Sequence, residues 1–151
     1  MLSKDFKEFV ALLNSNGVEY LVVGGYALAA HGHPRYTGDL DIWVGVTPEN
    51  IARLLKALDE FGFGSVGLTA ADFVQPGMIV QLGYPPVRID LLTTIDGVQF
   101  AECYPRRAMI AAAGVDLPIL HLADFKARAS GRAKDLADLE ALDMPPDGDS
   151  P

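Results

Sequence analysis

The segment Asp39–Val46 constrains the fold of this chain more than any other part of the sequence. Its first residues alternate between carboxylates and apolar side chains, a pattern that predicts a strand with one buried face. Successive side chains of a strand point to opposite faces of the sheet, so Asp39 and Asp41 leave one face together. Leu40 and Ile42 leave the other face and can be buried. We therefore expect a sheet that is packed on one side and carries two acids on the other.

The rest of the sequence alternates between helix and strand signals. Ser3 can cap a first helix that stops at Asn16-Gly17, and Thr47 can cap a helix over Pro48–Phe61 with proline at its first position. Further strands are predicted at Val18–Val23, Met78–Tyr84, Val87–Thr93, Met109–Ala112 and Leu117–Leu120, and further helices at Tyr26–His31, Leu122–Ser130 and Ala133–Leu142. Pro85-Pro86 is expected to join a hairpin. This order predicts an α/β (α+β) fold, a mixed sheet with helices packed on it and short helices at the C-terminal end.

Length and charge limit the classes of protein that the chain can belong to. The 151 residues predict a single domain over 1–142, followed by a disordered Pro-rich tail, 143–151, with three acids and no bases. A net charge of −8 argues against a protein that grips duplex DNA through many phosphates. No apolar run is long enough to span a membrane. Cys103 is the only cysteine, so we expect a buried thiol, no disulfide and a cytoplasmic protein.

The paired carboxylates predict a metal site. Two acids about 6.5 Å apart on one strand repel each other unless a cation offsets their charge, and hard oxygen ligands favour Mg²⁺ or Mn²⁺. Asp90 is also a polar residue in an otherwise apolar strand, between Ile89 and Leu91. If its strand neighbours Asp39–Val46, three carboxylates converge as a two-metal phosphoryl-transfer site requires. Taken alone, each motif is more typical of a solvent-facing strand.

The glycine pair Gly24-Gly25 follows a predicted buried strand and precedes a helix. A turn of this kind exposes backbone N–H groups that can bind phosphate. The spacing fits neither a dinucleotide fingerprint nor a P-loop, because no third glycine and no Gly-Lys-Ser/Thr follow. Close packing of helix on strand is the alternative explanation for the pair.

Together these motifs resemble the signature of the nucleotidyltransferase superfamily, the DNA polymerase beta-like proteins. The resemblance rests on Gly24-Gly25, the helix after it, Arg35-Tyr36-Thr37-Gly38-Asp39-Leu40-Asp41 and a later strand aspartate, Asp90. The segment Lys126–Asp138 resembles the end of small bacterial minimal or toxin-like members. The similarity touches the chain from about Val18 to Leu142.

The resemblance implies a function and a role for each matching residue. Asp39, Asp41 and Asp90 would hold the metal and be catalytic, while Gly24, Gly25, Arg35, Thr37 and Lys126 would bind the nucleotide. The implied reaction moves a nucleoside monophosphate from an NTP to a hydroxyl of an RNA end, a protein or a small molecule, and releases pyrophosphate. The chain lacks the added helical domain of larger relatives, and Gly25 stands where many members have serine. The alternative is therefore a catalytically inactive binding module or a toxin–antitoxin component with a cognate antitoxin.

Four individual residues and one short segment also carry expectations. Arg35 and Lys126 are the cations expected near the triphosphate, although either can be an ordinary surface residue. Arg88 is expected to face away from Asp90 as a surface charge. Trp43 shares a face with the acids and can stack on a base or pack in the core. The segment His31-Gly32-His33 is expected to be a loop that closes the site rather than a metal site.

Overall fold

The fold is described from a computed structural model, which covers residues 3–32, 39–63, 67–75, 77–84, 87–95, 97–112 and 114–128. Arg35 and Thr37, the predicted helix Ala133–Leu142 and the predicted tail 143–151 lie outside these described residues.

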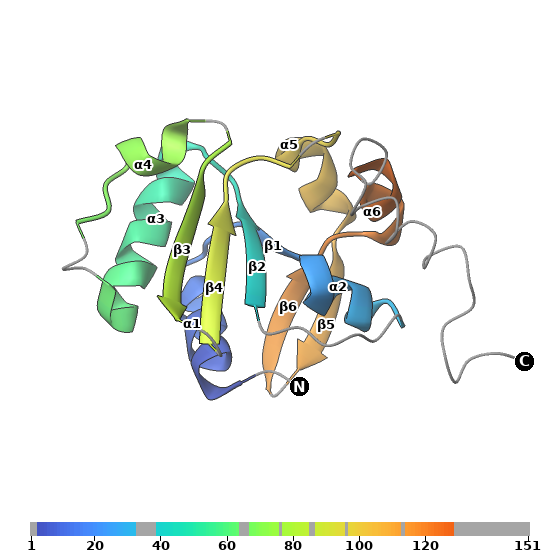
Figure 1. The fold of residues 1–151 in the computed structure, drawn as a ribbon, viewed down its shortest axis with the longest axis horizontal. Coiled ribbons are helices and arrows are strands. Elements are labelled where there is room, and N and C mark those ends of the chain that lie inside the picture. The colour runs from blue at the N-terminus through green and yellow to red at the C-terminus, as the bar shows by residue number, and fades with distance from the viewer. Residues whose placement is uncertain are drawn as a thin grey trace, which may run out of the picture.

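A mixed six-stranded sheet forms the centre of the protein (Figure 1). Its strands follow the order β3-β4-β2-β1-β6-β5 across the sheet. The pairs β2–β4 and β1–β6 are parallel, while β1–β2, β3–β4 and β5–β6 are antiparallel. The strands are β1 (Tyr20–Val23), β2 (Asp39–Val44), β3 (Ile79–Tyr84), β4 (Val87–Leu92), β5 (Ala108–Ala112) and β6 (Val115–Ile119). The antiparallel pairing of β3 with β4 confirms the predicted hairpin, and the mixed α+β fold is confirmed as well.

The two longest helices begin where the sequence predicts. Helix α1 (Lys4–Ser15) starts with the Phe6 N–H donating to Ser3 Oγ at 3.2 Å. Helix α3 (Pro48–Leu58) starts with the Asn50 N–H donating to Thr47 Oγ1 at 3.2 Å. Each bond satisfies a backbone donor that the first helical turn leaves without a partner. The remaining elements are α2 (Gly24–Ala30), the π-helical turn η1 (Asp59–Phe63), α4 (Ala71–Val74), α5 (Phe100–Cys103), the 3₁₀ turn η3 (Tyr104–Arg106) and α6 (Leu122–Arg128).

Helix α1 covers one face of the sheet and lies behind it in Figure 1. It packs on β4, β6 and α3, and the side chains of Leu40 and Ile42 on β2 are fully buried in the core. Near this face, Asp5 and Glu8 of α1 line a small pocket with Ile89 of β4. Ile89 is the register partner of Leu40, so the core face of β2 and β4 is the one that α1 covers. The aspartates of β2 point away from this face.

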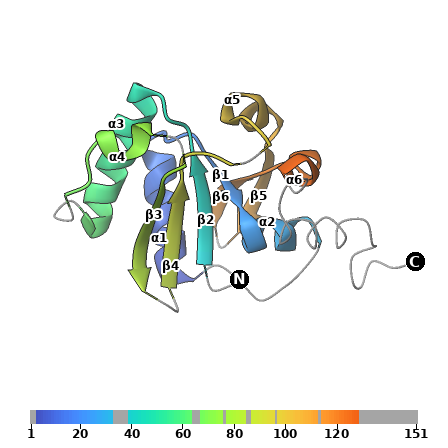
Figure 2. The same ribbon diagram turned by 45° about the horizontal axis from the view of Figure 1, so that its top comes forward.

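Helices α5 and α6 lie near the end of the sheet toward which β2 and β4 run, as the tilted view in Figure 2 also shows. Helix α6 was predicted; α5 and η3 were not. None of the helices within the described residues has the length and apolar character needed to cross a membrane.

Candidate functional site

The three acids of the predicted metal site leave the same face of the sheet. Asp39 and Asp41 are separated by one residue on β2, and the parallel pairing of β2 with β4 makes Asp41 the register partner of Asp90. Register partners on adjacent strands point to the same side. The structure therefore brings Asp39, Asp41 and Asp90 onto the face that α1 leaves uncovered. Asp90 is the most buried of them, with 8% of its surface exposed.

Gly24 makes room for the Asp41 carboxylate. It follows β1 directly, where Val23 is the register partner of Asp41, and it has a φ of +72°. A Cβ atom built on Gly24 would overlap Oδ2 of Asp41 and lie 3.1 Å from its Cγ. Both the backbone conformation and the close contact therefore require glycine at this position.

The glycine pair differs in one respect from the turn that the sequence predicts. Helix α2 already begins at Gly24, rather than at Tyr26 after a two-residue turn. The N-cap residue Val23 supplies no side-chain hydrogen bond to the backbone N–H groups of the first turn. These N–H groups belong to the Gly24-Gly25 end of a seven-residue helix beside Asp41.

The predicted direction of the Arg88 side chain is wrong. It does not face away from Asp90: its Nη2 donates to Oδ2 of Asp39 at 2.7 Å and to Oδ2 of Asp90 at 3.3 Å. Arg88 and Asp90 stand two positions apart on β4, so both side chains leave the same face. This strand parity was the signal that could have placed Arg88 correctly. The guanidinium group offsets the charge of two of the three acids.

One oxygen of Asp90 has no hydrogen-bond partner among the residues that the structure describes. Its Oδ1 is buried and lies 3.3 Å from Nε of Arg88, but the two atoms are not oriented to form a hydrogen bond. A buried carboxylate oxygen without a hydrogen bond is energetically costly, and a bound cation would compensate for it.

The chemistry of these acids suits a divalent metal, but their arrangement in the structure does not. The donor chemistry suits Mg²⁺ or Mn²⁺, because three carboxylates share one face and one oxygen lacks a hydrogen bond. The positions of the side chains do not suit a metal, since the described residues contain no group of three or more His, Cys, Asp or Glu side chains that could hold an ion. Arg88 contacts Asp39 and Asp90 where a cation would bind. The acids fit a metal only if this guanidinium group moves away.

The other predicted residues lie at different places. Lys126 is exposed on α6, and its role in nucleotide binding stays a prediction. His31 ends α2, and its Nε2 lies 2.7 Å from the carbonyl oxygen of Leu120. Trp43 is fully buried and its Nε1 donates to the carbonyl of Thr93 at 3.3 Å. With 1% of its surface exposed, Trp43 packs in the core, as one of its two interpretations expects, and it also lines a cavity.

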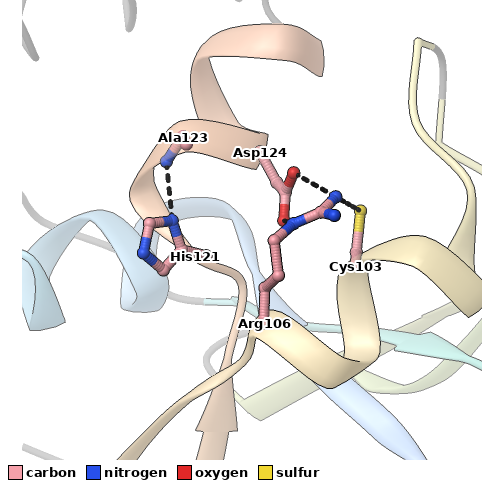
Figure 3. A network of polar contacts seen from close by, with 5 residues as sticks. All are labelled: Cys103, Arg106, His121, Ala123 and Asp124. Carbon is pink, nitrogen blue, oxygen red and sulfur yellow. Dashed lines mark hydrogen bonds and ion pairs between the residues drawn. The ribbon is translucent and has the colours of Figure 1, made fainter.

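A polar network that the sequence analysis did not predict joins η3 to α6 (Figure 3). Arg106 donates to both carboxylate oxygens of Asp124, from Nη2 at 2.8 Å and from Nε at 3.1 Å. Cys103, whose Sγ lies 4.0 Å from Arg106 Nη2, is fully buried, as predicted. Burial, and then the charge of Asp124, raise the pKa of the Cys103 thiol to about 11. This thiol is therefore protonated near neutral pH and is a poor nucleophile.

No protein-family model and no curated protein sequence matches the chain. Among solved structures, it is similar to a protein from Thermotoga maritima described as a "putative nucleotidyltransferase". The TM-score is 0.58 at 14% sequence identity, and the match covers 95% of this chain and 91% of that one. At this identity the likeness concerns the fold. The chain shares the mixed α+β fold of that protein over nearly its whole length.

Proposed function

We propose that this protein is a metal-dependent nucleotidyltransferase that moves a nucleoside monophosphate from an NTP to an acceptor hydroxyl. The observation that carries the proposal is the placement of Asp41 and Asp90 as register partners, with Asp39 on the same face. Gly24 supports it, because a glycine after β1 leaves space for the Asp41 carboxylate. The fold shared with the Thermotoga maritima protein adds independent support.

In the proposed site, Asp39, Asp41 and Asp90 would hold Mg²⁺ or Mn²⁺. When bound, the metal supplies positive charge for the triphosphate and lowers the pKa of the attacking hydroxyl. Asp90 has the lowest exposure of the three acids and a buried oxygen without a hydrogen bond, which suits a ligand that must stay fixed. By the resemblance, Asp90 would also help to activate the acceptor hydroxyl.

Arg88 has a place in the same proposal. Its guanidinium group must leave Asp39 and Asp90 before a metal can bind both acids. Once released, a planar cation with several donors suits the oxygens of a triphosphate. Gly24, Gly25, Arg35, Thr37 and Lys126 complete the proposed nucleotide site, as the resemblance implies. The acceptor remains an RNA end, a protein or a small molecule.

The proposal is tested by a labelling experiment in which a cell lysate supplies many candidate acceptors together. The protein is incubated with each α-³²P-labelled NTP, Mg²⁺ and a cell lysate, and the labelled product is identified. We expect label on one class of molecule, dependent on Mg²⁺ and absent with Asp90→Asn. Equal labelling by the parent and by Asp90→Asn would contradict the proposed site.

Metal binding has a separate test that needs no substrate. Millimolar Mg²⁺ or Mn²⁺ should raise the melting temperature, because a cation that binds only the folded protein stabilises it. Asp41→Asn should remove that rise. An equal rise in this variant means that the metal binds elsewhere.

A second candidate function is a catalytically inactive binding module that keeps the fold. Such a module acts as a nucleotide sensor or as one component of a toxin–antitoxin pair. The observation that favours it is the ion pair of Arg88 with Asp39 and Asp90, which offsets the acids without a metal. The labelling experiment separates the two, since a binding module labels nothing in the lysate at any metal concentration.

A further inference from the structure

A cavity of about 600 Å³ lies along the same two strands as the acids. Trp43, which lines the cavity, follows Asp41 on β2. Thr93, which also lines it, follows Asp90 directly after the end of β4. Trp43 is two residues beyond Asp41, so its side chain leaves the same face, roughly 7 Å farther along the strand. The volume falls within the range of about 300 to 1,000 Å³ that small-molecule sites occupy.

Aromatic rings form part of the cavity wall. The Phe100 ring meets Trp43 edge to face, with centroids 5.3 Å apart and an interplanar angle of 88°. It stacks on Tyr104 at 5.3 Å and 18°, and the Arg107 guanidinium group lies 4.1 Å from the Tyr104 ring centroid. The indole is held in turn by its bond to the carbonyl of Thr93. The rings are therefore positioned before any ligand arrives, which lowers the entropy that binding costs.

The segment that carries Phe100 and Tyr104 is anchored from its far end. Arg106 of η3 makes its paired hydrogen bonds to the buried carboxylate of Asp124 on α6, as Figure 3 shows. Cys103, which lies between Phe100 and Tyr104 in the sequence, is buried in the core. Helix α5 is only four residues long and cannot hold its position alone. The bond to α6 therefore fixes this wall of the cavity.

The polar groups of the cavity wall limit what it can bind. Of the described residues that line it, Glu19 is the only one with a formal charge, so the wall offers no cation for a phosphate. Gln99 and Thr94 are exposed at the wall, and the Gln99 side chain makes no capping bond to α5. An amide can both donate and accept, as the edge of a nucleobase requires. Aromatic walls with a few hydrogen-bonding groups suit an uncharged planar ring.

We propose that this cavity binds a nucleobase. The choice of a nucleobase among planar rings rests on the proposed function. None of the three acids lines the cavity, but Trp43 of its wall lies two residues beyond Asp41 on the same strand. The base can come from two sources: the NTP itself, or a nucleotide that serves as acceptor. Both present the same flat, uncharged heterocycle to the partly exposed rings of Phe100 and Tyr104 and to Gln99.

The test uses Trp43 as its reporter, since the chain contains one tryptophan. Adenosine, guanosine, cytidine and uridine are each titrated against the protein without metal or triphosphate, and indole fluorescence is recorded. We expect a saturable change with at least one nucleoside. Ala101→Leu, an exposed cavity-lining position on α5, should fill the cavity and weaken binding by about tenfold or more. Val46→Phe, from the segment after β2, fills it independently and should act in the same way.

The matched control is Ala11→Leu, an alanine that is also exposed on a helix but lies on α1, on the other face of the sheet. It should bind nucleosides like the parent. The proposal is overturned if no nucleoside gives a saturable change, or if both folded filling variants bind as tightly as Ala11→Leu.

The source of the base is decided by repeating the titration with a saturating Mg²⁺-bound non-hydrolysable ATP analogue. Competition assigns the cavity to the base of the NTP, while unchanged or tighter nucleoside binding assigns it to the acceptor. Because the first titration contains neither metal nor triphosphate, its failure leaves the labelling experiment unaffected. Loss of transfer in Asp90→Asn likewise leaves nucleoside binding at Trp43 intact.

Discussion

Arg88 and Asp39 form an ion pair across two parallel strands, with Nη2 of Arg88 2.7 Å from Oδ2 of Asp39. They are register partners on β4 and β2, and the same guanidinium group also contacts Asp90. The acids of the proposed metal site are thus paired with a side chain of the protein itself. Any divalent cation that binds both acids must compete with Arg88.

This competition predicts the behaviour of Arg88→Met. Without metal, the variant should lose on the order of 1 kcal/mol of unfolding free energy, a modest loss because the side chains of Arg88 and Asp39 are about a third exposed. Mg²⁺ or Mn²⁺ should then raise its melting temperature more than it raises that of the parent, because no guanidinium group has to be displaced. Thermal unfolding with and without metal measures both effects.

The control for this variant is Arg53→Met, an exposed arginine on α3. It should keep the parental response to metal. An identical metal-induced shift in Arg88→Met and the parent would show that Arg88 and the metal do not share a site.

The contact between Gly24 and Asp41 predicts a second result. Gly24→Ala should destabilise the protein through both the φ of +72° and the overlap of Cβ with the Asp41 carboxylate. Gly114→Ala isolates the first effect, because Gly114 has a φ of +83° and no neighbouring atom within 4 Å of its Cβ position. The left-handed conformation alone costs about 1 to 2 kcal/mol. Chemical denaturation should show a loss larger by at least about 1 kcal/mol at Gly24, and equal losses would remove the overlap as a factor.

The sequence predicts this face of the sheet better than it predicts the contacts on it. Alternation along β2 is a local property, so the common face of Asp39 and Asp41 follows from spacing alone. The pairing of Asp41 with Asp90 depends on which strands become neighbours, and α3, α4 and β3 intervene in the chain. Strand parity, had it been applied correctly, would have placed Arg88 on the face of Asp90 instead of the opposite face. Only the register shows that Arg88 reaches Asp39.

The cavity beside Trp43 was harder to predict for a physical reason. Its wall includes α5, four residues followed by a 3₁₀ turn that contains Pro105, which is too short to show helical periodicity. Phe100 is held by tertiary contacts with Trp43 and by the anchor between Arg106 and Asp124. No local pattern encodes contacts of this kind. The positive φ of Gly24, rather than of Gly25, likewise depends on the path of the chain out of β1.

The raised pKa of the Cys103 thiol predicts a loss of stability at alkaline pH. Burial, followed by the Asp124 carboxylate, raises its pKa from 9.0 to about 11, while Arg106 acts in the opposite direction. Between about pH 9 and 11 the unfolded chain releases the thiol proton before the folded protein does, so stability falls as pH rises. Burial also raises the pKa of Tyr20, which adds to the same trend. Denaturation from pH 8 to 11 should show a shallower decline in Cys103→Ala, and an unchanged decline would exclude the thiol as a cause.

The last prediction separates nucleotide binding from transfer at Asp90. Asp90→Asn keeps the size of a nearly buried side chain and removes the charge that would hold the catalytic metal. The other metal would arrive with the triphosphate, so calorimetry should find binding of Mg²⁺-NTP within a few fold of the parent. Transfer measured on the labelled product should fall by a factor on the order of 10² to 10³ or more, because the lost interaction acts mainly in the transition state. Asp116→Asn removes an exposed acid from another strand, β6, and should transfer at the parental rate. If folded Asp90→Asn matches Asp116→Asn in transfer, Asp90 is a structural partner of Arg88 and the third metal ligand must be sought elsewhere.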